Sequence, residues 1–211
     1  MRFPDAKVTT LDLMRHGEPV GGRMLRGTIN HPLSERGWQQ MLNAVSQMMA
    51  DGEPPWDAIV TSPLARCQEF ALWLGEYHDL PVTIEPGLAE MSLGDWEGKT
   101  HAEVREAEGD ELDRQAALWS DPSRTSPPGG EDMEAFDARV GDAWQGLLAE
   151  PPGHHLLVVC HLFVTNAVLH QVLEQPLSRL LTFDLPYAAT CRIRHECHAL
   201  GETSLVEWIG R

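Results

Sequence analysis

The chain has 211 residues and a mass of 23.5 kDa, with 42% hydrophobic and 23% charged residues, which fits one globular α/β or α+β domain and excludes disordered and fibrous proteins. Sixteen basic and 32 acidic residues give a formal charge of −16, which repels polyanions, so neither nucleic acid nor an anionic membrane is expected as a partner. A local group of arginines can still bind a small anion, and 14 of the 16 cations are arginine, a residue suited to bidentate recognition of phosphate or carboxylate.

Cysteine content and hydropathy predict a cytoplasmic protein. Four cysteines are too few for a disulfide framework in a chain of this length. Residues 1–14 lack the apolar core of a signal peptide, and no apolar run approaches the roughly 18–20 residues that span a bilayer. We therefore expect a reducing compartment.

The first half of the chain alternates strand and helix patterns. Ser34 has the chemistry of a helix N-cap, and Ser62 followed by Pro63 is typical of a second helix start. Glycine and proline interrupt the segment between the first strand and the first helix. The predicted elements are a strand over residues 8–14, a helix over 34–49, a strand over 56–61, a helix over 62–77 and a strand over 82–84.

The second half begins with a polar excursion over residues 88–130, partly helical over 99–119. The apolar stretch 155–159 is typical of the middle of a parallel sheet. Strands that alternate with helices predict one α/β domain over residues 1–211, a three-layer sandwich with a central, mainly parallel sheet, helices on both faces and a small helical cap around 88–130. The remaining predicted elements are helices over 131–149 and 162–174 and strands over 190–195 and 204–209.

Three predicted strands end in reactive or cationic residues. Arg15 and His16 follow the first strand, Ser62 and nearby Arg66 follow the second, and His161 follows the fourth. Ligands of open parallel sheets bind beyond the carboxyl ends of the strands, so these side chains are expected to converge there. Two guanidinium groups and two imidazoles are difficult to bury without an anion, which predicts an anion site.

Six segments, in order along most of the chain, carry a resemblance to a known family. The chain resembles the histidine phosphatase superfamily, also called phosphoglycerate-mutase-like, through RHGE at 15–18, PLSERGWQQ at 32–40, TSPLAR at 61–66, LAE with GDWEG at 88–98, PGGE at 128–131 and VVCH at 158–161. The loop after RHGE also resembles that of the α-ribazole-5′-phosphate phosphatases.

The resemblance implies a metal-independent phosphatase that acts on a small phosphate monoester and needs no cofactor. His16 is then the nucleophile that forms a phosphohistidine, and His161 stabilises the transferring oxygens. Glu90 protonates the leaving alkoxide and later activates water. The residues expected to hold the phosphate are Arg15, Gly17, Arg26, Arg66 and His161.

Three other functions stay open at this point. A cofactor-dependent phosphoglycerate mutase would need extra cations just after Glu90, where residues 91–95 contain none. A silent phosphate-binding homologue is favoured only by Leu162 and Phe163, which replace the small residues that many family members have after the second histidine. A metal site on the strand from Cys191 to His198 lacks the usual zinc spacing, and no metal is predicted. Either a monomer or a homodimer is compatible with the sequence.

Overall fold

The computed structural model describes residues 5–108 and 114–210. A six-stranded sheet forms its centre, with the strand order β3-β2-β4-β1-β5-β6. The first four strands in that order are parallel, whereas β5 and β6 are antiparallel to their neighbours. The strands are β1 (Lys7–Arg15), β2 (Ala58–Thr61), β3 (Val82–Ile84), β4 (His155–Cys160), β5 (Thr190–His198) and β6 (Gly201–Ile209).

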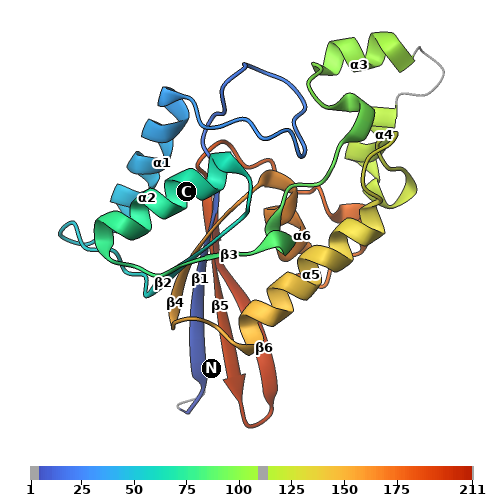
Figure 1. Ribbon diagram of the computed structural model, residues 1–211. Coiled ribbons are helices and arrows are strands. Elements are labelled where there is room, and N and C mark those ends of the chain that lie inside the picture. Colours follow the sequence, from blue (N-terminus) through green and yellow to red (C-terminus); the bar gives the residue numbers. More distant parts are fainter. Residues whose placement is uncertain (1–4, 109–113, 211) are drawn as a thin grey trace.

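Helices cover both faces of this sheet, which confirms the predicted fold class (Figure 1). Helices α1 and α2 pack on one face around Met14, Phe70 and Val159, and α5 and α6 pack on the other around Leu13 and Phe136. The alternation of side chains along a strand sends Leu13 and Met14 to opposite layers. The helices are α1 (Glu35–Met48), α2 (Ala65–His78), α3 (His101–Glu108), α4 (Arg114–Ser120), α5 (Met133–Ala149) and α6 (Leu162–Val172).

The start of α2 differs from the sequence prediction. Its N-cap is Leu64, in extended conformation and without a side-chain cap, so Ser62 and Pro63 precede the helix. The predicted cap at Ser62 is wrong, because its hydroxyl accepts from Leu64 N at 3.3 Å in a turn that precedes the helix, and it also pairs with the distant His161. The cap at Ser34 is confirmed, since its side chain accepts a hydrogen bond from Gly37 N at 3.0 Å.

The polar excursion forms α3 and α4 at one end of the molecule, above the carboxyl ends of the parallel strands (Figure 1). Residues 109–113 of the predicted cap lie outside the described residues. The GDWEG and PGGE loops pack on each other in this region: Gly94 has a φ of +52°, and a Cβ there would lie 2.2 Å from Pro128 O. Glu97 accepts backbone N–H groups from Thr28 and Leu93, which ties the cap to the loop after β1.

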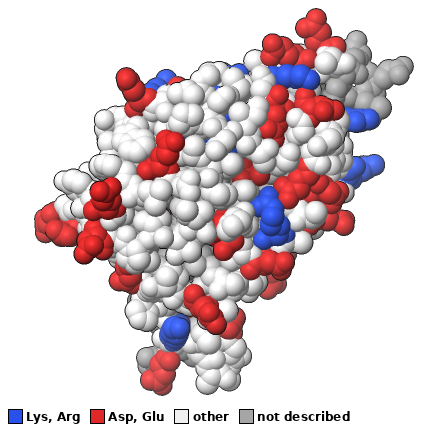
Figure 2. Space-filling model, in the orientation of Figure 1, with Lys and Arg blue, Asp and Glu red and all other residues white. Residues whose placement is uncertain are grey.

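None of the helices in the described part of the chain is both long and apolar enough to cross a lipid bilayer. On the face of the molecule shown in Figure 2, acidic side chains are spread over much of the surface, whereas Lys and Arg are few. This distribution is expected from a formal charge of −16.

Candidate active site

The topology brings three strand ends together. Strand β4 lies between β1 and β2, and all three are parallel, so His16, Ser62 and His161 follow neighbouring carboxyl ends. The rings of His16 and His161 meet edge to face, with centroids 5.2 Å apart. Both side chains are buried, His161 completely. The structure therefore juxtaposes two of the residues that the sequence proposed for catalysis.

His16 is held in one tautomer by its own loop. Its Nδ1 lies 2.7 Å from the carbonyl oxygen of Gly17 and must donate to it, which leaves the lone pair on Nε2. Burial, together with the positive charges of Arg66 and Arg15, lowers the pKa of His16 well below 6.5. The ring is therefore neutral at physiological pH, and Nε2 has the electronic state of a nucleophile.

Arg15 and Arg66 lie beside this ring and are fixed by carbonyl groups. Arg15 donates to Leu185 O, and its guanidinium stacks 4.4 Å from the ring centroid of Tyr187. Arg66 donates to Gly27 O at 2.7 Å and to Ile29 O at 2.9 Å. No carboxylate hydrogen-bonds to either guanidinium among the described residues, so the charge of both is available to an anionic ligand.

Arg26 and Gly17 have structural roles in addition to the phosphate contacts predicted for them. Arg26 lines the cavity, but its outer nitrogens donate to the carbonyls of Val20, Gly22 and Met24. A Cβ at Gly17 would lie 2.1 Å from Gly37 O, so glycine is required there by close packing against the start of α1. The Nε–H groups of Arg15, Arg26 and Arg66 are each buried without a hydrogen-bond partner.

Glu90 stands on the loop between β3 and α3, half-buried in the cavity wall. Burial raises the pKa of its carboxyl group, against the lowering effect of Arg66 and of two backbone N–H groups. Those donors are Met91 N, 3.0 Å from Oε1, and Phe163 N, 3.3 Å from Oε2. A carboxyl group with a raised pKa beside two arginines has the properties of a general acid.

His161 is the N-cap residue of α6, and its ring contacts that of His16. Its Nε2 lies 2.6 Å from Ser62 Oγ, and the buried thiol of Cys67 is 3.6 Å from the same nitrogen. Burial, with Arg66 and His16, lowers the pKa of His161 well below 6.5. The second histidine is therefore also neutral, and Ser62 orients it.

Several residues of the site were missed by the sequence analysis. Tyr187 was assigned no role, yet its ring lies under Arg15 and 5.8 Å from the ring of His16. Ser34 Oγ donates to Glu18 O and Gln40 Oε1 accepts from Glu18 N, so the PLSERGWQQ segment holds the loop that follows His16. The PLSERGWQQ motif can be read from the sequence, but its role follows only from the packing of α1 against residues 17 and 18.

These groups open into a cavity of about 770 Å³. Arg15, His16, Arg66 and Glu90 line one part of it. The cap and α6 supply the other part, with His101, Trp119, Leu162 and Phe163. Leu162 and Phe163, which depart from the family pattern, therefore face the cavity and shape it.

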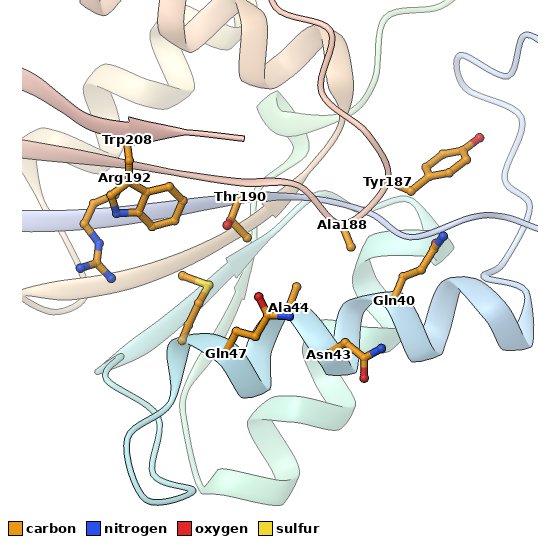
Figure 3. A pocket seen from close by; sticks show the side chains of 10 residues that line it. Gln40, Asn43, Ala44, Gln47, Tyr187, Ala188, Thr190, Arg192 and Trp208 are labelled. Atoms are coloured by element: carbon orange, nitrogen blue, oxygen red, sulfur yellow. The ribbon is translucent and has the colours of Figure 1, made fainter. Parts of the chain in front are cut away.

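A second cavity, of about 530 Å³, lies between α1 and the strands β5 and β6 (Figure 3). It contains neither histidine of the site. Arg192 in its wall is bound to the buried carboxylate of Asp12, with Nε 2.6 Å from Oδ1. Tyr187 borders both cavities, and its ring points away from Arg192 and Trp208 in this view (Figure 3).

The cysteines and histidines of β5 do not gather around one point. Cys191 is buried in the core, Cys197 is exposed, and His195 Nδ1 lies 3.0 Å from Ser204 Oγ. Within residues 5–108 and 114–210, no group of three or more His, Cys, Asp or Glu side chains is arranged to hold a metal ion.

Comparison with known proteins agrees with this geometry. The model of the histidine phosphatase superfamily (branch 1) matches residues 11–207. The chain is 31% identical over 174 residues to the adenosylcobalamin/alpha-ribazole phosphatase of Salmonella typhimurium, covering 81% of this chain and 83% of that one. It is 32% identical over 168 residues to a bifunctional protein of Mycobacterium tuberculosis, covering 79% of this chain and 44% of that protein.

The chain thus spans about half the length of several curated relatives that it matches. Among solved structures, a mycobacterial glucosyl-3-phosphoglycerate phosphatase superposes with a TM-score of 0.80 at 24% identity, covering 97% of this chain and 100% of the other, which supports the fold. The match of the family model over nearly the whole chain, together with the paired histidines at adjacent strand ends, shows that this protein belongs to branch 1 of the histidine phosphatase superfamily.

Proposed function

We propose that this chain is a metal-independent phosphatase that hydrolyses a small phosphate monoester through a phosphohistidine at His16. The observation that carries the proposal is the state of His16: a neutral ring whose Nδ1–H is bound to Gly17 O and whose Nε2 is free, next to two guanidinium groups. The named relatives of this chain include phosphatases, which supports the same reaction class.

In the first step, Nε2 of His16 attacks phosphorus as the ester P–O bond breaks. The departing oxygen takes the proton of Glu90, so the alcohol leaves neutral. Arg15 and Arg66 neutralise the non-bridging oxygens, and His161, oriented by Ser62, stabilises the charge that develops on them.

In the second step, the carboxylate of Glu90 accepts a proton from water as the water oxygen bonds to phosphorus and the P–N bond breaks. Inorganic phosphate leaves, and His16 and protonated Glu90 are restored. Glu90 gives one proton to the alcohol and regains one from water, so the two steps balance without a metal or redox partner.

The physiological substrate and the cellular setting are part of the proposal. Two of the relatives act, by name, on α-ribazole phosphate and on glucosyl-3-phosphoglycerate. Turnover of α-ribazole 5′-phosphate that exceeds turnover of generic sugar phosphates would support the first of these substrates.

The four cysteines are free thiols, three of them buried, which supports a reducing cytoplasm.

The deciding experiment measures phosphate release from p-nitrophenyl phosphate in EDTA by the wild type, by His16→Ala and by His154→Ala. His154 is exposed and lies outside the cavity, so it is the matched control. We expect turnover in the wild type and the control, none in His16→Ala, and an acid-labile phosphoenzyme only in the active proteins. Inactivity of the wild type with tight phosphate binding would identify a silent homologue, and faster transfer between positions of phosphoglycerate than release to water would identify a mutase.

A further inference from the structure

Aromatic side chains line part of the cavity that contains the arginines. Trp119 of α4 and Phe163 of α6 meet edge to face, with centroids 5.4 Å apart and planes at 90°. Phe163 is 5% exposed, whereas Trp119 is 40% exposed and borders the cavity. Met24 and Leu162 extend this apolar surface.

The aromatic residues lie next to Glu90, the proposed general acid. Phe163 N donates to Oε2 of Glu90 at 3.3 Å, so the carboxyl group of Glu90 lies beside the residue whose ring lines the cavity. An alcohol protonated by Glu90 would therefore leave next to this surface. Arg26 also borders the cavity, but its outer nitrogens are occupied by three backbone carbonyls, which leaves the exposed Arg23 to pair with any second anionic group of the substrate.

Resting on the proposed function, we propose that the site selects phosphate monoesters whose alcohol carries an aromatic or other flat apolar group. The ring would pack against Trp119 and Phe163 while the phosphate lies between Arg15 and Arg66. Aromatic rings bury large areas at low entropic cost, so this contact discriminates against small polyols.

The test compares benzyl phosphate with glycerol 3-phosphate, two esters whose leaving groups are both primary alkoxides. We expect kcat/KM for benzyl phosphate to exceed that for glycerol 3-phosphate by about tenfold or more, and Trp119→Ala to reduce the ratio to about one. Trp73 of α2 is 36% exposed and lies outside the cavity, so Trp73→Ala is the matched control and should preserve the ratio.

A wild-type ratio near one, or an unchanged ratio in Trp119→Ala, would overturn the substrate proposal. Absence of phosphate release from both esters and from p-nitrophenyl phosphate would instead contradict the proposed function, so the two failures are distinguishable.

A second and independent observation concerns an ion pair outside the cavity. Arg139 of α5 forms two parallel hydrogen bonds with Glu131, from Nε to Oε1 at 2.9 Å and from Nη2 to Oε2 at 2.8 Å. The remaining nitrogen, Nη1, donates to Gly87 O at 2.8 Å and to Ala89 O at 3.1 Å. Glu131 N in turn donates to Ser92 O at 2.9 Å.

These contacts hold the chain on both sides of Glu90. Ala89 immediately precedes it, and Ser92 follows it by two residues. We infer that the Arg139–Glu131 pair positions the carboxyl group of Glu90 so that it faces the leaving oxygen. This would also explain the role of Glu131, the last residue of the PGGE segment. This inference likewise rests on the proposed function.

Leaving groups of different acidity isolate this effect. Release of the alcohol makes the first step irreversible, so kcat/KM reports substrate binding and phosphorylation of His16 and does not include hydrolysis of the phosphohistidine. p-Nitrophenolate leaves without a proton, whereas a benzyl alkoxide requires one from Glu90. A defect confined to aiming Glu90 therefore lowers kcat/KM for benzyl phosphate and leaves that for p-nitrophenyl phosphate nearly unchanged.

Arg139→Lys keeps the charge but loses the planar fork. We expect it to lower kcat/KM for benzyl phosphate about tenfold or more and for p-nitrophenyl phosphate by less than about twofold. Arg194→Lys, which alters another arginine paired with carboxylates but on β5, is the control and should change neither value. Equal losses for both substrates in Arg139→Lys, with a lowered Tm, would mean that the pair serves stability alone and would overturn the inference.

Discussion

The Nδ1 atom of His16 donates to the carbonyl oxygen of Gly17 across 2.7 Å, so the residue that follows the proposed nucleophile also sets its tautomer. This hydrogen bond favours the protonated ring slightly, but burial and two neighbouring arginines outweigh it and lower the pKa. The free Nε2 therefore stays unprotonated at pH values where an exposed histidine carries a charge.

The pKa values of His16 and Glu90 are shifted in opposite directions, and these shifts predict the pH dependence of catalysis. Lowering the pKa of His16 keeps it deprotonated toward acid pH, and raising that of Glu90 keeps it protonated above its ordinary 4.5. We expect the ratio of kcat/KM for benzyl phosphate to that for p-nitrophenyl phosphate to fall as pH rises through the pKa of Glu90, by about tenfold per pH unit. In Glu90→Gln the ratio should be low and independent of pH. A wild-type ratio that is constant with pH would remove Glu90 from the role of acid.

The contact between Gly17 and Gly37 predicts a large effect on stability. Each glycine lacks the Cβ that would collide with the backbone of the other segment, at 2.1 Å for Gly17 and 2.0 Å for Gly37. Gly17→Ala should lower the free energy of unfolding by about 1–3 kcal/mol or more, because backbone atoms must move. Gly146 of α5 has no atom within 4 Å of a Cβ position, so Gly146→Ala should raise stability by about 0.5–1 kcal/mol. Urea denaturation monitored by tryptophan fluorescence measures both, and equal effects would refute the steric explanation.

Asp12, buried in the middle of β1, predicts a stability that depends on pH. Burial alone would raise its pKa, but hydrogen bonds from His155, Arg192 and Trp56 outweigh burial and lower it. Its contribution is therefore complete above the unfolded-state pKa of about 3.9 and is lost as pH falls through the lower folded-state value. Asp12→Ala leaves those three donors without their acceptor and should cost about 3–5 kcal/mol at pH 7.

Denaturation of both proteins at several pH values tests this account. The difference between the wild type and Asp12→Ala should be constant near neutrality and shrink in acid. A difference that grows as the pH falls would show that the sign of the pKa shift is wrong.

The burial of the thiols predicts which cysteines an alkylating reagent can reach. Cys67, Cys160 and Cys191 are buried and Cys197 is exposed. Burial raises the pKa of Cys160 to about 12 and that of Cys67 well above its ordinary value, which makes both unreactive. Native protein should therefore take up one equivalent of iodoacetamide at Cys197 with no loss of activity, and denatured protein four. Rapid alkylation of Cys67 with inactivation would show that the region around His161 opens in solution.

The sequence by itself determined the alternation of strands and helices, the cap at Ser34 and the convergence of Arg15, His16 and His161 on one edge of the sheet. These features depend on local chemistry: side-chain periodicity, capping groups and the rule that parallel strands share a carboxyl edge. The family resemblance added Glu90, which periodicity and spacing alone would have treated as a solvated loop carboxylate.

Only the tertiary structure decided the roles of Ser62, Tyr187, Gly17 and the Arg139–Glu131 pair. Ser62 has a good cap sequence, but its hydroxyl closes a turn before the helix and also pairs with a histidine 99 residues away, and a long-range hydrogen bond of this kind has no local signature. The same holds for Leu162 and Phe163, whose effect on the site depends on whether their side chains face the core or the cavity. These long-range contacts depend on the position of β4 between β1 and β2 and on where the cap packs. Neither can be read from the order of residues along the chain.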